Sequence, residues 1–328
     1  MSSAIEYENP LLKIDTSFQS YLILHSLTPK ITSESVNYAF QTECLSRQSL
    51  NNITGWNKLV KSITSTDMPS VMKRYFDGAV TVDGWNNTKI YDIAKTCAER
   101  LKARLPAIMI NTKINTPELV AVFAEGIEPC IIMTKSLVGM CSEEELVFIL
   151  ATGISRTHNN HCIYNFIAPY IGFAEGTEKQ KNFTRIESIP KQLNYIMTDW
   201  ARFADVTNDR AVMICLDEPE RFPYILKSLS DKKIPLFMNY DNDEKFKPES
   251  VIDNYNKTVK FTAARELNIP PETTRAERRI LCALEFLNCE IYYNCRSDIS
   301  SEGRGHIVNK PMIDLRCDII IGASKGVE

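Results

Sequence analysis

Apolar residues recur every three or four positions in several stretches of the chain, as expected for helices with one buried face. In 89–105 they include Ile90, Ile93 and Cys97, and Pro106 ends the stretch. The spacing therefore predicts a helix that stops before this proline. Comparable patterns predict further helices over 34–45, 67–75, 191–215, 218–230, 248–267 and 274–287.

The clearest helix signal begins at Ser142. Glu145 stands three residues later, so the two form a capping box, and acidic residues fill the first turn. The apolar pattern then continues towards His161, with Gly153 in mid-helix, where it costs about 1 kcal/mol relative to alanine. We predict one long helix here.

Short apolar runs predict strands at Ala107–Asn111, Val120–Glu125 and Cys130–Thr134. A turn at Gly126–Pro129 separates the last two, which predicts a small antiparallel or mixed sheet. Ile313–Gly322 is a candidate for a further strand. The fold class is therefore α+β, a mostly helical protein with a small sheet beside the helix that starts at Ser142.

Composition narrows the functional classes. The 328 residues are 44% hydrophobic, which is typical of a globular protein. The net charge of −3 argues against nucleic-acid binding. No apolar run is long enough for an integral membrane segment, and Met1–Lys13 has no apolar core of a signal peptide. The ten cysteines are spread without CxxC pairs, so we expect buried thiols and a cytoplasmic location.

Common cofactor motifs do not occur in the sequence. It contains no GxGxxG, no GxxxxGK[ST] and no GxSxG, so we predict neither a cofactor nor the usual phosphate-binding loops. His158 and His161 are three residues apart on the predicted helix and offer at most an adventitious metal site; we expect no metal. Their location at a helix end fits exposed histidines that interact with the helix dipole.

An ordered set of motifs resembles the HtpX-like and CAAX-prenyl-protease-like zinc endopeptidases. A strand after Pro106, a hairpin and an acidic helix start precede Glu144–His161, which is similar to that family's HExxH helix. Asp205–Ala211 is similar to its ExxxDR segment, and Glu266–Ile280 to its SHPxxxxRI segment. The resemblance covers about 89–288 and implies a zincin-like domain there, after a helical N-terminal region at 1–88 and before an extension at 289–328.

The resemblance assigns the zinc site to residues with different chemistry. The first histidine ligand falls on Thr152, the catalytic glutamate on Gly153, the second histidine on Arg156 and the third ligand on Asp205. Zinc hydrolysis needs imidazole ligands and a carboxylate base. A permanently charged guanidinium repels zinc, and glycine cannot accept a proton. We therefore expect no catalytic residue and no zinc proteolysis.

Arg156 and Asp205 are then expected to form an ion pair in place of the metal, with a contribution from Thr152. The alternative is that Arg156 points to solvent. The resemblance also places Asp209 and Arg210 at the family's conserved DR dipeptide, here as an internal polar pair. It places Val120, Val122 and Phe123 on the edge strand that lines the substrate cleft.

Three hypotheses about function follow. The first is a catalytically inactive pseudopeptidase that binds a protein or peptide partner. The second is a divergent hydrolase that uses other residues in the same cleft, and the third is an assembly subunit that associates through 1–88. Since the side chains for zinc catalysis are missing, the sequence favours the first hypothesis over the second. It does not separate the first from the third.

Overall fold

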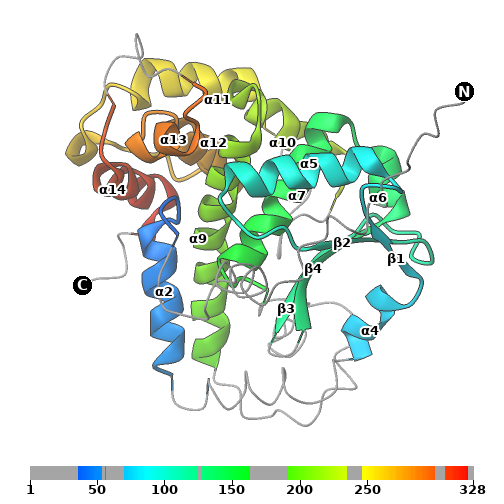
Figure 1. Cartoon of the computed structure of the whole chain (residues 1–328). Helices are drawn as coiled ribbons and strands as arrows, with labels where there is room; N and C mark the ends of the chain where they lie inside the picture. The colour runs from blue at the N-terminus through cyan, green and yellow to red at the C-terminus, as the bar shows by residue number, and fades with distance from the viewer. Residues whose placement is uncertain are drawn as a thin grey trace, which may run out of the picture. The chain divides into compact units, whose positions relative to one another are not determined.

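In the computed structural model a four-stranded mixed sheet lies to one side of most of the helices (Figure 1). The structure describes residues 36–53, 56, 70–124, 127–162, 191–234, 246–299 and 307–323. All of these belong to one unit, Glu34–Glu328, which includes residues on both sides of positions 88 and 288. The α+β class is thereby confirmed.

The strands lie in the order β1-β2-β4-β3. Their bounds are Ala79–Val82 for β1, Ala107–Asn111 for β2, Leu119–Ala124 for β3 and Ile127–Thr134 for β4. Strand β2 pairs in parallel with β4, whereas the other two pairings are antiparallel. The predicted mixed sheet is confirmed. Strand β1 was not predicted, since only one of its four residues is buried and its apolar pattern is weak.

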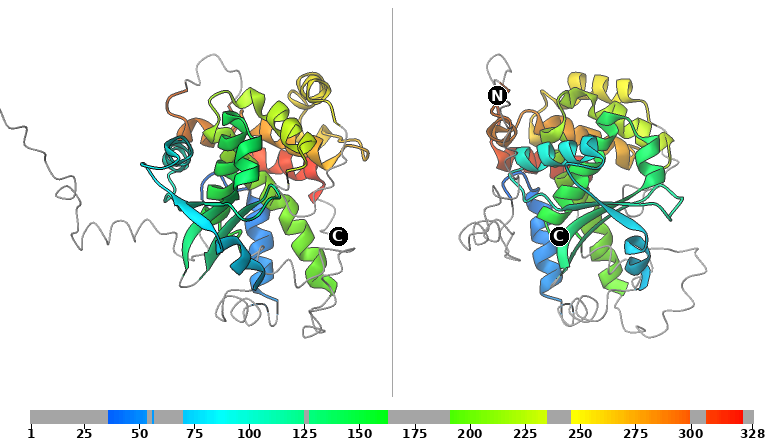
Figure 2. Two further views of the ribbon diagram at one scale, coloured as in Figure 1. Left: turned by 90° about the vertical axis from the view of Figure 1, so that its right-hand side faces the viewer. Right: turned by 45° about the vertical axis from the view of Figure 1, so that its right-hand side comes forward.

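Helices α5 (Thr88–Arg100) and α7 (Glu143–His158) contribute to the core beside this sheet. Both were predicted from sequence. In α7 the Ser142 side chain accepts from Glu145 N and the Glu145 side chain accepts from Ser142 N, so the predicted capping box is present. Figure 2 shows the two helices and the sheet from the side.

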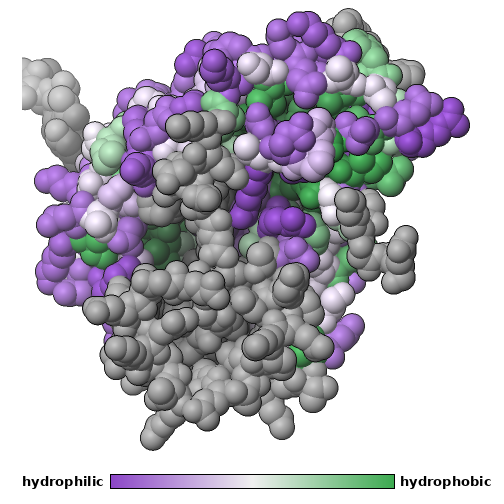
Figure 3. Space-filling view, turned by 180° about the vertical axis from the view of Figure 1, so that it is seen from behind, coloured by the Kyte–Doolittle hydropathy of each residue, from purple (hydrophilic) through white to green (hydrophobic). Residues whose placement is uncertain are grey.

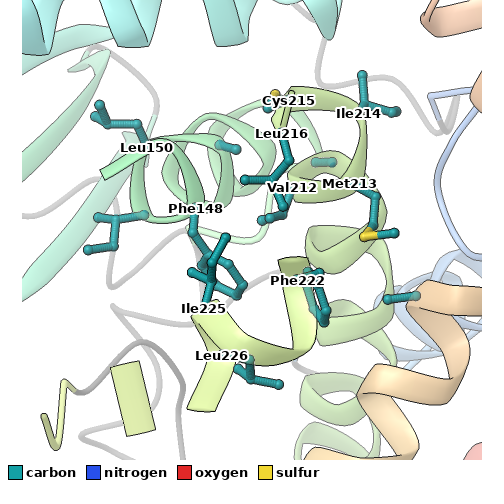
Figure 4. Close-up of a cluster of buried hydrophobic side chains, with 14 of the residues drawn as sticks. Phe148, Leu150, Val212, Met213, Ile214, Cys215, Leu216, Phe222, Ile225 and Leu226 are labelled. Carbon is teal, nitrogen blue, oxygen red and sulfur yellow. The ribbon is translucent and has the colours of Figure 1, made fainter. Parts of the chain in front are cut away.

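The long helix α9 (Lys191–Cys215) contacts α2 (Gln41–Asn51), α7 and α12 (Arg275–Phe286), and α2 lies alongside it (Figures 1 and 2). After a short turn of 3₁₀-helix, α10 (Phe222–Asp231) returns towards α7. Figure 4 shows the buried side chains of α7, α9 and α10, among which Phe148 and Phe222 stack with ring centroids 5.4 Å apart.

The predicted helix over 248–267 is interrupted. Helix α11 (Pro248–Asn254) continues as one π-helical turn, Tyr255–Val259, and a separate 3₁₀ turn follows at Ala264–Glu266. The remaining helices are α4 (Ser70–Phe76), α6 (Lys135–Met140), α13 (Glu290–Cys295) and α14 (Lys310–Ile321). The predicted helix over 34–45 begins only at Gln41.

The strand predicted at Ile313–Gly322 is wrong, because this segment is helix α14. Three local features determine the helix. The Asn309 side chain accepts a hydrogen bond from Met312 N, Pro311 lies in the first turn, and Gly322 ends the helix with a φ of 74°. These caps outweigh the strand preference of the isoleucine run at its end.

Two findings bear on cellular environment and redox chemistry. No helix in the described part of the chain is long and apolar enough to cross a membrane. The ten cysteines all lie within the described ranges and are thiols, as predicted. Burial raises the pKa of Cys130 to about 11, which makes this thiol a poor nucleophile.

Candidate functional site

Three helices each carry a pair of polar residues, and the charged members of these pairs interact across the helices. Members of each pair are four residues apart, so they share one face of their helix. The pairs are Thr152 and Arg156 on α7, Asp205 and Asp209 on α9, and Arg275 and Arg279 on α12. We call the five charged residues of these pairs the ionic cluster.

Helix α12 supplies cations to Asp205 and Asp209 of α9. Arg279 donates to Asp209 through Nε at 2.8 Å and Nη2 at 2.5 Å, and both side chains are 2% exposed. Arg275 forms an ion pair with Asp205. Burial raises the pKa of Asp209 to about 6, although the Arg279 guanidinium acts in the opposite direction. Each aspartate is thus held by an arginine 70 residues further along the chain.

Arg156 belongs to the same cluster and is partly buried. Burial lowers the pKa of its guanidinium, the Asp205 carboxylate raises it, and the Arg279 cation lowers it again. The guanidinium nevertheless stays charged at any physiological pH. Asp205 therefore interacts electrostatically with two cations, Arg275 and Arg156, so the residues at two of the proposed ligand positions do influence each other.

The other two positions are closed by packing. Thr152 is 1% exposed, and within the described residues its Oγ1 has no hydrogen-bond partner. A Cβ added to Gly153 would lie 2.8 Å from Ile131 Cδ1 and 3.2 Å from Ile131 Cγ1 and Cγ2. Position 153 therefore faces β4 at a distance that only glycine fits without movement, and it leaves no space for a carboxylate.

Strand β3 lies at the edge of the sheet, as predicted. Its residue Ala121 is opposite Ile131, which packs on Gly153. Because side chains alternate along a strand, Val120 and Val122 point to the other face, away from α7. The structure does not bring them to Thr152. Phe123 belongs to β3, but its side chain lies outside the described part of the structure.

Asp209 and Arg210 have separate partners. Arg210 is fully buried and pairs with Asp314 of α14, with Nη2 and Oδ1 2.7 Å apart. Its guanidinium lies 5.3 Å from the Phe40 ring centroid and 5.2 Å from that of Phe286. Adjacent positions on α9 thus face α12 and α14, which fits a role in holding the helices together.

The two histidines lie in different surroundings. His158 Nδ1 is 3.4 Å from the Tyr38 hydroxyl, and burial lowers the pKa of His158 to about 4. His161 is buried rather than exposed, and its Nε2 is 3.2 Å from Oε1 of the buried Glu43, which also accepts from Trp200 Nε1 at 2.7 Å. The expectation of exposed histidines at the helix end is therefore wrong for His161.

Metal-ligating side chains do not gather elsewhere in the described ranges, where no group of three or more His, Cys, Asp or Glu residues could hold an ion. Of the expected site residues, Asp205 and Asp209 each pair with an arginine of α12, and the Asp205 carboxylate raises the pKa of Arg156. Sequence reasoning assigned no role in the site to Arg275 and Arg279 of α12. The available signal was their four-residue spacing, which matches that of the aspartates on α9.

Comparison with known proteins adds no relative. The chain matches no protein-family model, and no curated protein or solved structure is similar to it. The likeness to HtpX-like endopeptidases thus depends on the order of motifs and elements within this chain alone.

Proposed function

We propose that this chain is a non-catalytic relative of HtpX-like zinc endopeptidases that acts by binding a protein or peptide. One observation carries the proposal. The position that would hold a histidine ligand carries Arg156, whose guanidinium is permanently charged and cannot bind zinc. A cation therefore occupies the place where the relatives would bind theirs.

The arrangement of elements is compatible with that descent. The mixed sheet has an antiparallel edge strand, β3, next to β4, and α7 packs on these two strands. Helix α9, which carries the third position, packs on α7. An edge strand can accept an extended peptide through main-chain hydrogen bonds, and this capacity needs no metal.

The hydrolase alternative requires an acid or base that substrate can reach. Asp209 has a raised pKa, but both of its oxygens accept from Arg279 and its side chain is 2% exposed. At Gly153 the packing against Ile131 leaves no position for a base. These contacts favour a structural role for the ionic cluster.

Two measurements on the purified full chain test the proposal. Elemental mass spectrometry of untagged protein is expected to find zinc well below one atom per chain. Incubation with casein, with and without added zinc, is expected to yield no product above the background of a heat-inactivated sample. Stoichiometric zinc, or cleavage that a chelator abolishes, would refute it.

The binding half of the proposal has its own test. A display library of random 16-residue peptides, selected on the immobilised full chain, is expected to yield sequences that bind the folded protein but not a heat-denatured sample. If no peptide is retained after repeated selection, the chain does not act by peptide recognition, and assembly through another surface becomes the better explanation.

A further inference from the structure

A groove of about 1400 Å³ runs between the end of α11, its π-helical turn, α12 and α14. Figure 3 views the molecule from behind and shows hydrophobic residues gathered in the part of the surface where these helices lie. The groove is larger than the roughly 300–1,000 Å³ of sites for small molecules. Its size therefore favours a segment of polypeptide as the occupant.

Large apolar side chains on the groove walls are open to solvent. Phe261 is 82% exposed, Leu315 46%, Met312 43% and Ile307 40%. On α14 the side opposite Met312 and Leu315 is also apolar and packs in the core through Ile313, Cys317 and Ile320. A helix that is apolar on both sides is typical of one that is covered on both sides.

Polar groups on the groove floor already have partners. Arg316 donates to both oxygens of Glu285 at 2.7 Å, and it donates to the carbonyls of Val259 and Thr262. These bonds fix the end of the π-helical turn, and they leave the carboxylate of Glu285 neutralised. The floor thus provides rigidity, and recognition depends on the apolar walls and on the charges at the rim.

The rim carries an exposed lysine beside Phe261. Lys260 Nζ lies 5.6 Å from the Phe261 ring centroid, whereas the exposed Arg265 is paired with Glu266 at 3.3 Å. Since Arg316 neutralises Glu285, Glu220 is the remaining acidic residue of the lining. Beside Phe261 the rim therefore offers the positive charge of Lys260, which complements a partner with a carboxylate beside its apolar side chains.

We propose that this groove binds an amphipathic helix of a partner protein, with apolar side chains on one face and Asp or Glu beside them. The walls are mostly helical, so they offer apolar ridges rather than a free strand edge, and such ridges pack against the apolar face of another helix. This inference rests on the proposed peptide-binding function and assigns the surface and the chemistry of the partner.

Peptides selected on the full chain provide the probe. Each enriched sequence is synthesised with a fluorophore, and its affinity is measured by anisotropy for the wild type and for Leu315→Glu. Leu45→Glu is the matched control, since Leu45 is also a helical leucine and is 50% exposed, outside the groove. We expect Leu315→Glu to weaken binding about tenfold or more, and Leu45→Glu to leave it unchanged.

A second pair of variants tests the charge. Lys260→Glu is expected to weaken binding several-fold. The control is Lys95→Glu, because Lys95 is an exposed lysine of α5 outside the groove, and it should leave the affinity unchanged. The enriched peptides are expected to be acidic, with apolar residues at helical spacing. If peptides bind but their affinity is the same for Leu315→Glu, Lys260→Glu and the wild type, this inference is overturned and the proposed function stays intact. Dissociation of a dimer by Leu315→Glu, seen by light scattering, would overturn it in favour of self-association.

Discussion

The ionic cluster and the groove beside α14 differ in whether their side chains find partners within the chain. In the cluster, charged side chains are buried and paired across helices, as Asp209 and Arg279 are at 2.5 and 2.8 Å. In the groove, the charged floor is paired as well, but large apolar side chains such as Phe261 remain open to water. The first region is complete within one chain and the second is not.

This contrast separates stability from recognition. A buried pair becomes costly as soon as one partner is lost, because the other charge stays buried without compensation. An exposed apolar side chain contributes little to folding, since water surrounds it in both states. Substitutions in the cluster should therefore change the free energy of unfolding, and substitutions in the groove should change binding.

The largest effect is expected at Gly153. Gly153→Glu restores the residue type that the peptidase resemblance places there, but its Cβ alone would meet Ile131 at 2.8 Å, and the carboxylate would be buried. We expect a loss of about 4 kcal/mol or more in the free energy of unfolding. Urea denaturation followed by circular dichroism measures it.

Gly139→Glu is the control for this substitution. Gly139 also lies in a helix, α6, but it is exposed, and an added Cβ would meet nothing within 4 Å. The control should change the free energy of unfolding by less than about 0.5 kcal/mol. If Gly153→Glu were as stable as the wild type, position 153 would face open space, and the conclusion that packing closes this position would be wrong.

The next effect comes from breaking the Asp209–Arg279 pair. Arg279→Met removes the cation and leaves a buried carboxylate, which should cost about 3–5 kcal/mol. Lys257→Met breaks an exposed pair with Asp253 and should cost less than about 1 kcal/mol. Equal losses in the two variants, measured by the same denaturation, would contradict the central role of the cluster.

The helices that bear the cluster could be predicted from sequence, but the pairing between them could not. Apolar spacing and a capping box are local signals, and they gave α7 and α9 near their observed bounds. Nothing local connects Asp205 to Arg275, which lies 70 residues away. Only the packing of α9 against α12 decides which cation meets which carboxylate.

Local signals were weak or in conflict at two further elements, β1 and α14. Strand β1 has four residues with one buried, so no alternation is visible. In α14 the isoleucines near the end suggested a strand, whereas Asn309, Pro311 and Gly322 determine a helix. The groove could not be predicted either, because its walls include α14, which was expected to be a strand, and the π-helical turn, which was expected to be regular helix.

A smaller effect should appear on lowering the pH. The pKa of His158 in the folded chain is about 4, below the ordinary 6.5, because burial disfavours the imidazolium. The folded state therefore loses stability as the pH falls from 6.5 towards 4. Between about pH 7.5 and pH 5 the loss should be about 2 kcal/mol. His158→Gln lacks this titration, so the difference between the two denaturation series measures it; parallel series would contradict the assignment.

The smallest effect on stability is expected in the groove, where a substitution should change binding and leave the free energy of unfolding nearly unchanged. Phe261→Ser removes an aromatic ring that is 82% exposed, so the free energy of unfolding should change by less than about 0.5 kcal/mol. Affinity for the selected peptides should nevertheless fall several-fold. Phe222→Ser is the contrast, because that ring is fully buried, and it should be strongly destabilising. A large loss of stability in Phe261→Ser would mean that this ring completes the fold rather than a binding surface.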